Sequence, residues 1–428
     1  MIKHLINNIF YKKKVTKEIF WATCAKGVSI SGGLFVLIFV PKVAGVEIFG
    51  SFSLILAYIL IFGVLSGVPV QAAIKKEVTE GKWNTLSKRY FIESIKIKFM
   101  ASIVSPLLVY LAIDIFNINV LKENFLLFLL LLITRNFWGS IVTTLEAVHR
   151  LFYVAIIYIV EWAVKITAII LFYNLYGLTV KTLLLSFFIG YFSAFIVGLG
   201  IILKNYQGIE FREILLLDRL ILIQILKRAF YLSLTSLTGV LLARIDVIMI
   251  SHYLSFEYIG WYNIASDISK QMTIISVPFI LGTIPLFVSD KEPHRLLFTS
   301  LKKLFVINLI IFFFIFFGSK YIILLLFGEQ FLNVVVILKI LAIFPLCAAM
   351  QHYMQQILIL YDKTNRIFLF GVFAVALNIA LNTIFIPLYS INGAAVATIV
   401  SYVIWVIISF VYLNMLLHTQ RRDTAVPG

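Results

Sequence analysis

Long apolar stretches recur along the whole chain and are separated by short polar segments. A helix of about 20 apolar residues crosses the ~30 Å hydrocarbon core of a bilayer and satisfies its own backbone hydrogen bonds. The pattern therefore predicts an all-α integral membrane protein with about twelve transmembrane helices. We place them at residues 17–40, 47–74, 90–116, 124–147, 151–174, 181–203, 228–250, 259–289, 303–327, 332–360, 367–388 and 393–416.

Basic residues lie mostly in every second loop between these helices. About 24 lysines and arginines fall on one set of loops, such as Lys75–Arg89, and about four fall on the other set. Because an excess of Lys and Arg marks the cytoplasmic side, the pattern predicts that both termini are cytoplasmic. An even number of helices fits this topology. The external loops are short, so no soluble domain is expected there.

The chain also divides near its middle. Residues 204–227 mix leucine and isoleucine with charged residues and predict a cytoplasmic amphipathic linker. It would join an N-terminal six-helix bundle, 1–203, to a C-terminal six-helix bundle, 228–428. A short repeat supports two related halves: Glu47-Ile-Phe-Gly50 matches Glu257-Tyr-Ile-Gly260 at an offset of 210 residues.

Composition excludes several classes of protein. The chain is 62% hydrophobic and 13% charged, which is incompatible with a soluble globular domain. Its net charge of +16 reflects loop charge and topology, so we expect no nucleic-acid partner. Cys24 and Cys347 lie in apolar runs without metal-ligand spacing, and the chain has no Walker lysine loop. We therefore expect no metal, no cofactor and no enzymatic activity.

Nine charged residues lie deep within the predicted membrane helices. Other charged residues lie near cytoplasmic helix ends and are expected at the membrane interface, namely Glu18, Glu93, Lys96, Lys98 and Glu146. Left unpaired in lipid, the nine deep residues would cost about 20–30 kcal/mol, so they must pair or face water. Glu161 and Lys165 are four residues apart and can pair on one helix face, and Asp267 and Lys270 are neighbours three residues apart. Arg244 and Asp246 face different sides of a helix, so at least one of them needs a partner elsewhere. The full set of nine is Lys26, Arg135, Glu161, Lys165, Arg244, Asp246, Asp267, Lys270 and Lys339.

Six of these residues are basic and three are acidic, which leaves a surplus of about three positive charges within the bilayer. The basic residues divide three and three between the halves. This predicts a cationic, substrate-binding central cavity formed by Lys26, Arg135, Lys165, Arg244, Lys270 and Lys339. Glu161, Asp246 and Asp267 would serve in ion coupling or pairing. The alternative is that individual residues form interhelical ion pairs or extend toward the membrane surface, as Lys339 could from its helix start.

Four segments resemble the bacterial O-antigen and polysaccharide flippases of the multidrug/oligosaccharidyl-lipid/polysaccharide exporter superfamily. They are PKVAGVEIFGSFSLILAY at 41–58, RIDVIMISHYLSFEYIGWYNIASDI at 244–268, LFGEQFLNVVVILKILAIFPLCAAMQHYMQQIL at 326–358 and LNIALNTIFIPLYSINGAAVATIVSY at 377–402. The motifs are loose, but their order and spacing cover nearly the whole chain. They are typical of the superfamily and do not identify a substrate.

The resemblance implies two six-helix bundles around a cavity that opens alternately to each side of the bacterial inner membrane. The expected cargo is an undecaprenyl-pyrophosphate-linked oligosaccharide for lipopolysaccharide O-antigen or capsule, with other polysaccharide-assembly proteins as partners. The basic surplus suits a diphosphate. Two alternatives remain: a drug or cation antiporter of the same superfamily, which would favour an acidic cavity, and a glycan polymerase or ligase, which usually needs a large external loop.

Overall fold

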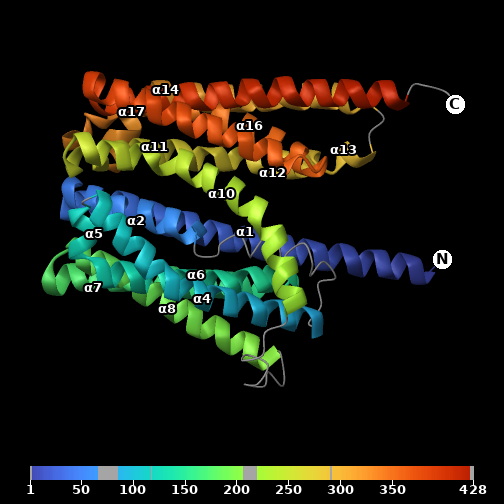
Figure 1. Cartoon of the computed structure of the whole chain (residues 1–428), viewed down its shortest axis with the longest axis horizontal. Helices are drawn as coiled ribbons and strands as arrows, with labels where there is room; N and C mark the ends of the chain where they lie inside the picture. The colour runs from blue at the N-terminus through green and yellow to red at the C-terminus, as the bar shows by residue number, and fades with distance from the viewer. Residues whose placement is uncertain (1, 66–84, 117, 206–218, 290–291, 425–428) are drawn as a thin grey trace. The chain divides into compact units, whose positions relative to one another are not determined.

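The computed structural model describes residues 2–65, 85–116, 118–205, 219–289 and 292–424, and this part of the chain is almost entirely helical (Figure 1). The larger helices pack along their length and alternate with short turns. The elements are α1 (Ile2–Ala44), α2 (Val46–Leu65), α4 (Thr85–Phe116), α5 (Asn119–Glu123), α6 (Phe125–Ala147), α7 (Leu151–Tyr176), α8 (Val180–Asn205), α10 (Arg219–Tyr253), α11 (Phe256–Met272), η1 (Thr273–Ser276), α12 (Val277–Thr283), α13 (Leu286–Ser289), α14 (Pro293–Leu326), η2 (Glu329–Phe331), α15 (Val334–Leu341), α16 (Phe344–Leu360) and α17 (Thr364–Thr424).

The predicted membrane-protein fold is confirmed. Among the described residues, ten helices are long and apolar enough to cross a membrane. Two features account for the difference from the twelve predicted spans. The predicted span 259–289 is broken into α11, η1, α12 and α13. The last two predicted spans form one assigned helix, α17, which bends at Ser390, where φ is 56°.

Glycines end several helices where the chain must turn. Gly45 has φ 91° between α1 and α2, Gly177 has φ 75° after α7, and Gly328 has φ 100° after α14. A side chain at such positive φ would be strained, because Cβ approaches the backbone. These turns set the up-and-down course of the chain through each bundle.

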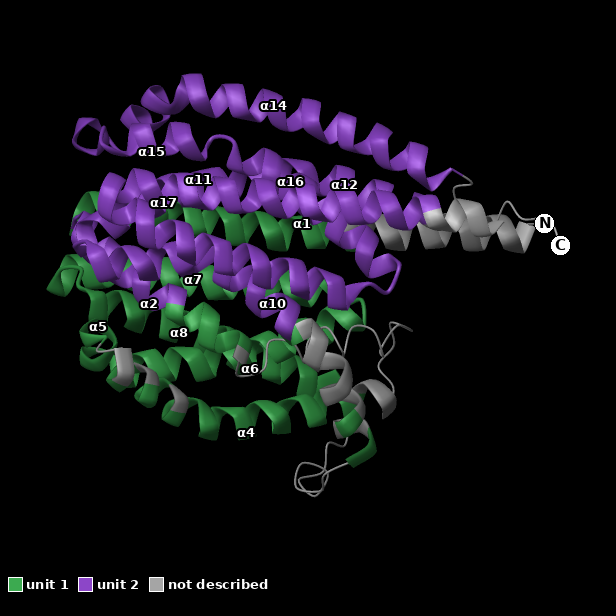
Figure 2. Ribbon diagram, turned by 45° about the horizontal axis from the view of Figure 1, so that its top comes forward, with its two compact units in different colours: residues 1–44, 58–233 green, residues 45–57, 234–428 purple. Residues whose placement is uncertain are grey.

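The chain forms two compact helical units (Figure 2). Unit 1 comprises residues 1–44 and 58–233, and unit 2 comprises residues 45–57 and 234–428. The first turns of α2 therefore belong with unit 2 and its remainder with unit 1. Most of the linker predicted at 204–227 lies outside the described residues, which resume at Arg219 in α10.

Unit 1 is organised around α7, which packs against α1 and α8, while α6 packs against α8. Its core is built from buried aliphatic side chains of these helices, including Ile141, Ile157 and Ala194. A hydrogen bond connects α1 to the start of α7: the Glu18 carboxylate accepts it from the Leu151 amide at 3.1 Å. A carboxylate at a helix N-terminus is favourable, since the free N–H groups there carry partial positive charge.

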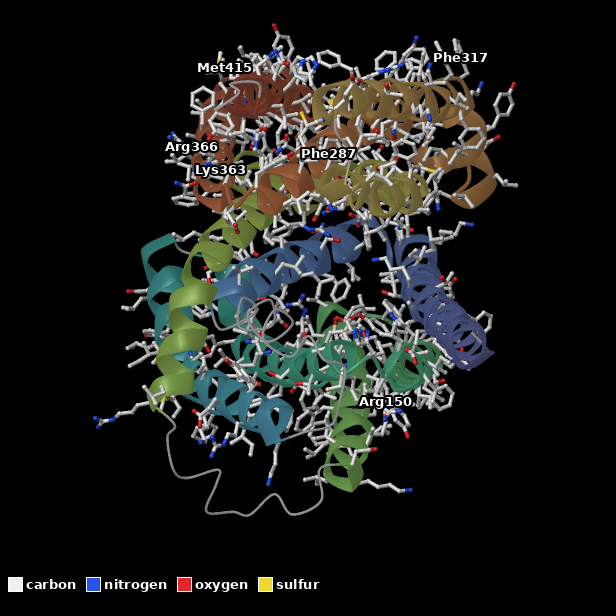
Figure 3. All side chains as sticks on the ribbon, turned by 90° about the vertical axis from the view of Figure 1, so that its right-hand side faces the viewer. Arg150, Phe287, Phe317, Lys363, Arg366 and Met415 are labelled. Carbon is white, nitrogen blue, oxygen red and sulfur yellow. The ribbon has the colours of Figure 1, made fainter. Side chains whose placement is uncertain are left out.

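Unit 2 packs α11 against α15 and α16, and α16 against α14 and α17. Large apolar side chains such as Phe317 of α14 are exposed and point away from the unit, as lipid-facing residues would (Figure 3). Lys363 and Arg366 lie close together at the turn between α16 and α17 (Figure 3). Arg366 lies 5.7 Å from the Tyr412 ring, near the end of α17.

His294, at the start of α14, also reaches the end of α17, with its Nε2 2.8 Å from Oδ1 of Asn414. The starts of α14 and α17 and the end of α17 are therefore at one end of unit 2. These are loops that the charge pattern predicts to share a side.

Candidate functional site

The α10–α11 hairpin places three of the predicted charged residues next to one another. Arg244 of α10 pairs with Asp267 of α11, with Nη1 and Oδ1 3.5 Å apart, and both side chains are partly exposed. Lys270 donates a hydrogen bond from Nζ to the Ala243 carbonyl at 2.9 Å. Asp267 forms its ion pair with Arg244 and not with its neighbour Lys270, because the guanidinium reaches it from α10. Lys270 itself forms no ion pair among the described residues, although the charges of Asp267 and Asp246 act on it.

Asp246 lies two residues beyond Arg244 and is almost completely buried. Its Oδ1 accepts a hydrogen bond from Asn382 at 2.8 Å. Its Oδ2 accepts hydrogen bonds from Tyr262 at 2.7 Å and from Thr398 at 2.6 Å. The prediction that Arg244 or Asp246 needs a partner on another helix is confirmed for both. Unlike Arg244, Asp246 has only neutral hydrogen-bond partners. Burying a carboxylate that forms no ion pair costs free energy.

Further oxygen and nitrogen atoms around Asp246 lack hydrogen-bond partners among the described residues. The Asn382 amide nitrogen also donates to Asn378 Oδ1 at 2.9 Å, and the Oδ1 of Asn382 itself accepts no hydrogen bond among the described residues. The amide nitrogen of Asn378 is unsatisfied too. Because buried polar groups are almost always hydrogen-bonded, these unsatisfied amide atoms beside a carboxylate make the network a candidate binding site.

In unit 1, Glu161 and Lys165 form the predicted ion pair on α7, with Oε1 and Nζ 2.5 Å apart. Lys165 has no exposed surface. Its ammonium lies 3.5 Å from the centre of the Tyr191 ring and 4.5 Å from that of Trp162, so aromatic faces stabilise the charge as well. Gly190 of α8 leaves the space for the lysine stem, since a Cβ there would lie 2.3 Å from Lys165 Cγ. The pair is enclosed between α7 and α8.

Arg135 of α6 is half-buried and lies against α2, because a Cβ on Gly63 would be 2.8 Å from its Nη1. Beside it, the fully buried Lys98 of α4 donates a hydrogen bond to the Asn136 carbonyl at 2.6 Å. Neither cation has an acidic partner among the described residues. Unit 1 therefore holds two adjacent basic side chains whose charges are not neutralised by a carboxylate.

The last two predicted basic residues lie apart from these clusters. The side chain of Lys26 on α1 is exposed. Lys339 of α15 is also exposed, and its Nζ lies 5.7 Å from the centre of the Phe316 ring. The structure thus brings Arg244, Asp267 and Lys270 together, places Asp246 in a neighbouring neutral network, and joins Glu161 to Lys165.

Sequence reasoning missed several of these residues. Lys98 was assigned to the membrane interface because it lies near the cytoplasmic end of a predicted span. Asn378, Asn382 and Thr398 were missed because they carry no charge. A detectable signal existed, since Asn378 and Asn382 are four residues apart in an otherwise apolar run and so share one helix face.

Comparison with known proteins gives a partial sequence match and full-length structural matches. No family model matches the chain. The probable flippase AglR of Haloferax volcanii is 25% identical over 167 residues, which cover 37% of this chain and 35% of AglR. The chain therefore matches about one third of the length of this relative.

Two solved structures match almost the whole chain. The lipid II flippase MurJ, in an inward closed conformation, superposes with a TM-score of 0.72 at 19% identity, covering 92% of this chain and 87% of MurJ. An inward-facing multidrug resistance transporter of the MATE family, in the MOP superfamily, superposes with a TM-score of 0.71 at 12% identity, covering 95% of this chain and 96% of the transporter. The chain has the fold of MurJ and the MATE transporters. This confirms the predicted fold class, an all-α integral membrane protein.

Proposed function

We propose that the chain is a flippase that moves an undecaprenyl-pyrophosphate-linked oligosaccharide between membrane leaflets by alternating access. The observation that carries this proposal is that Lys98 and Arg135, in candidate membrane helices, and Lys270, in α11, form no ion pair with a carboxylate among the described residues. Cations in the membrane need an anion or water, and a diphosphate supplies both charge and acceptor oxygens. The named match to a probable flippase supports the same activity.

The finer parts of the proposal follow from this cargo. The lipid-linked unit would serve O-antigen or capsule synthesis at the bacterial inner membrane, with both termini in the cytoplasm and the diphosphate in a cationic cavity. Lys26, Arg135, Arg244 and Lys270 would face that cavity. Lys165 is a weaker candidate than its sequence position indicates, because it is enclosed with Glu161. No covalent bond is made or broken, so the binding energy is used only to shift the populations of two conformations.

Asp246 is the favoured site for a coupling cation. Of the three predicted carboxylates, Glu161 is paired with Lys165 and Asp267 with Arg244, whereas Asp246 has only neutral partners. The carboxylate, the unsatisfied oxygen of Asn382 and the Thr398 hydroxyl form an oxygen-rich set that suits a proton or a hard cation such as Na⁺. Binding there would connect α10, α11 and α17 within unit 2.

The test is transport in proteoliposomes that contain purified protein and a radiolabelled undecaprenyl-pyrophosphate oligosaccharide. Wild-type protein should flip the lipid, and an imposed Na⁺ or proton gradient should increase the rate. Arg135→Gln should reduce flipping at least tenfold, while Lys181→Gln, at an exposed lysine of the same unit, should not change it. Equal flipping by the Arg135 and Lys181 variants would contradict the cationic cavity.

A second measurement separates coupling from cargo binding. Asp246→Asn should remove the response to the gradient, whereas Glu329→Gln, at an exposed carboxylate of unit 2, should retain it. A gradient response that survives in Asp246→Asn would exclude Asp246 as the coupling site without affecting the proposed cargo.

The drug antiporter remains the second candidate, because the fold is shared with the MATE transporters. Cationic drugs are repelled by uncompensated lysines and arginines, so the charges in both units favour an anionic cargo. Export of a cationic dye by the same proteoliposomes, without flipping of the glycolipid, would support the antiporter instead.

A further inference from the structure

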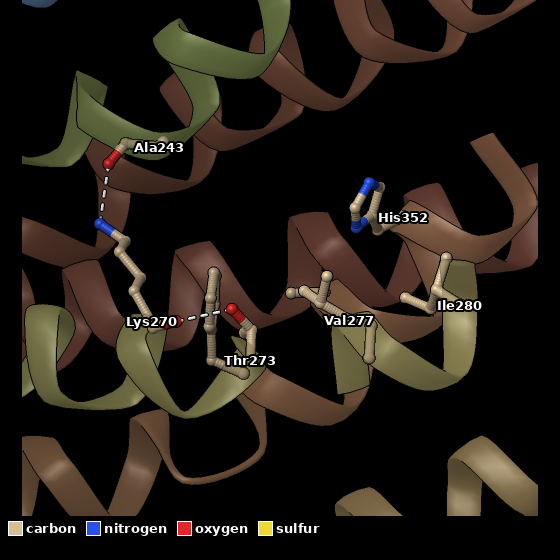
Figure 4. A pocket seen from close by; sticks show the side chains of 9 residues that line it. Ala243, Lys270, Thr273, Val277, Ile280 and His352 are labelled. Atoms are coloured by element: carbon tan, nitrogen blue, oxygen red, sulfur yellow. Dashed lines mark hydrogen bonds between the residues drawn. The ribbon is translucent and has the colours of Figure 1, made fainter. Parts of the chain in front are cut away.

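Unit 2 contains a cavity of about 260 Å³ where α11 breaks into η1 and α12 (Figure 4). Lys270, Thr273, Val277 and Ile280 line it from successive turns of α11, η1 and α12. Phe344 and His352 line it from α16. Lys270 and Ala243, which are hydrogen-bonded to each other in the α10–α11 hairpin, both line the cavity.

The polar groups of this cavity are hydrogen-bond donors. Lys270 uses one N–H on the Ala243 carbonyl, which leaves two N–H groups for another acceptor. Asp267, the nearest carboxylate along the helix, is paired with Arg244. The Thr273 hydroxyl donates to the Lys270 carbonyl at 2.6 Å, so this side chain is already satisfied as a donor. The ammonium therefore has spare donors, and Asp267, whose charge acts on it, is shared with Arg244.

His352 supplies the second polar group from the other wall (Figure 4). Its Nε2 lies 3.1 Å from the amide nitrogen of Gln356. When that amide donates, Nε2 is the acceptor and the neutral ring carries its proton on Nδ1. The imidazole then keeps one N–H donor for a ligand in the cavity.

The rest of the lining is apolar and small. Val277, Ile280 and Phe344 form the wall beyond the lysine, and alanines at 243, 348 and 349 leave the space open. Drug-sized ligands occupy sites of ~300–1,000 Å³, so this volume accommodates only a fragment of a glycolipid. A donor-rich end followed by an apolar wall matches an anionic group attached directly to an apolar chain.

We infer that this cavity holds a prenyl phosphate: the phosphate at Lys270 and His352, and the first isoprenoid units against Val277, Ile280 and Phe344. The inference rests on the proposed function and adds the position and orientation of the lipid end of the cargo. His352 becomes a phosphate-binding residue. The oligosaccharide lies outside the cavity, because the volume has no room for it.

The test is binding of farnesyl diphosphate, a short prenyl diphosphate, to the full-length protein in nanodiscs by isothermal titration calorimetry. Farnesyl diphosphate should bind at least tenfold more tightly than inorganic diphosphate, and also at least tenfold more tightly than farnesol. If inorganic diphosphate bound as tightly as farnesyl diphosphate, the cavity would recognise only the phosphate groups. If farnesol bound as tightly, the cavity would recognise only the apolar chain. Either result overturns the inference.

Three variants locate the site. Lys270→Gln and His352→Gln should each weaken binding of farnesyl diphosphate at least tenfold, because the first removes the ammonium charge and the second removes the imidazole N–H. Ala348→Leu should weaken it by filling the cavity while leaving both donors in place. Lys302→Gln, at an exposed lysine of unit 2, is the matched control and should bind like wild type. Size-exclusion profiles and melting curves establish that each variant is folded.

These results are separable from the proposed function. Unchanged binding in Lys270→Gln and Ala348→Leu would overturn the cavity assignment even if the wild-type protein flips glycolipids. Binding that depends on all three residues would sustain the assignment even if no flipping of the oligosaccharide-linked lipid were measured, in which case only the proposed cargo would fail.

Discussion

The tightest helix contact in unit 2 joins the two copies of the sequence repeat, and it gives a sharp prediction for Gly50 and Gly260. A Cβ on Gly50 of α2 would lie 1.9 Å from the Phe256 carbonyl oxygen of α11. A Cβ on Gly260 of α11 would lie 2.4 Å from the Val46 carbonyl oxygen of α2. Both obstacles are backbone atoms, which cannot move aside by rotating a side chain. Small residues of this kind let membrane helices approach closely.

The size of the effect follows from these distances. A close C–H···O contact has a carbon–oxygen separation of ~3.3 Å, so Gly50→Ala forces the two helices roughly 1.4 Å further apart. Overpacking of a well-packed interface costs about 1–3 kcal/mol. Replacing a helical glycine by alanine alone contributes about 0.5–1 kcal/mol of stability. We therefore expect Gly50→Ala and Gly260→Ala each to destabilise the protein by about 1–2 kcal/mol.

The assay is thermal unfolding of the detergent-solubilised protein, followed by fluorescence-detected size exclusion. Gly33→Ala in α1 and Gly239→Ala in α10 are matched controls, because a Cβ at either position has no atom within 4 Å. The controls should melt at the wild-type temperature or slightly above it, and Gly50→Ala and Gly260→Ala should melt several degrees below it. If Gly50→Ala were as stable as Gly33→Ala, the close crossing of α2 and α11 would be refuted.

Three further substitutions test individual charges. Lys165→Met should destabilise the protein by about 3–5 kcal/mol because it leaves Glu161 buried and unpaired, and adding Glu161→Gln should recover much of the loss, as measured by melting temperature. Arg244→Gln should change the free energy of unfolding by less than about 1 kcal/mol, since the ion pair of Arg244 is long and partly exposed. The same substitution should reduce glycolipid flipping. A large loss of stability would show that Arg244 has a structural role instead. Lys339→Gln should leave both the melting temperature and the flipping rate unchanged, because the side chain is exposed and only an aromatic ring lies near its charge. Reduced flipping by this variant would indicate that Lys339 does belong to the substrate-binding cavity.

The fold could be predicted from the sequence because membrane helices are specified locally. About 20 apolar residues suffice to define each one, and turn glycines such as Gly45 and Gly177 mark where they end. The breaks inside helices were harder to predict. The 3₁₀ segment η1 and the bend at Ser390 occur in runs that remain apolar throughout, so hydropathy carries no signal for them.

The candidate sites could be predicted only where partners are close in sequence. The Glu161–Lys165 pair follows from a spacing of four residues. The partners of Asp246 come from positions 16, 136 and 152 residues further along the chain, which only the packing of α10, α11 and α17 brings together. In an apolar sequence only charged residues stand out, whereas neutral groups such as Asn382 and Thr398 complete the site.

The two copies of the repeat share the glycine that packs at the helix crossing but differ in their charged residues. The contact between α2 and α11 is reciprocal: Gly50 meets Phe256 and Gly260 meets Val46, and the pairs Val46–Phe256 and Gly50–Gly260 both differ by the repeat offset of 210 residues. At the same offset, the positions equivalent to Asp267 and Lys270 are Ala57 and Leu60. Both copies of the repeated element therefore contribute a glycine to the one helix crossing, whereas only the second copy carries the charged residues.

This asymmetry constrains where transport chemistry can reside. The positions equivalent to Arg244 and Asp246 are the apolar Leu34 and Val36, so unit 1 has no counterpart of the hairpin charges or of the Asp246 network at the related sites. Its uncompensated cations, Lys98 and Arg135, come instead from α4 and α6. Moving Asp246 to its symmetry-related position, as Val36→Asp with Asp246→Asn, should therefore fail to restore a gradient response, because the side chains that hold the carboxylate, Asn382 and Thr398, bond to position 246. Restoration by that double substitution, measured in the same proteoliposomes, would mean that the repeat and not the local polar network determines the coupling site.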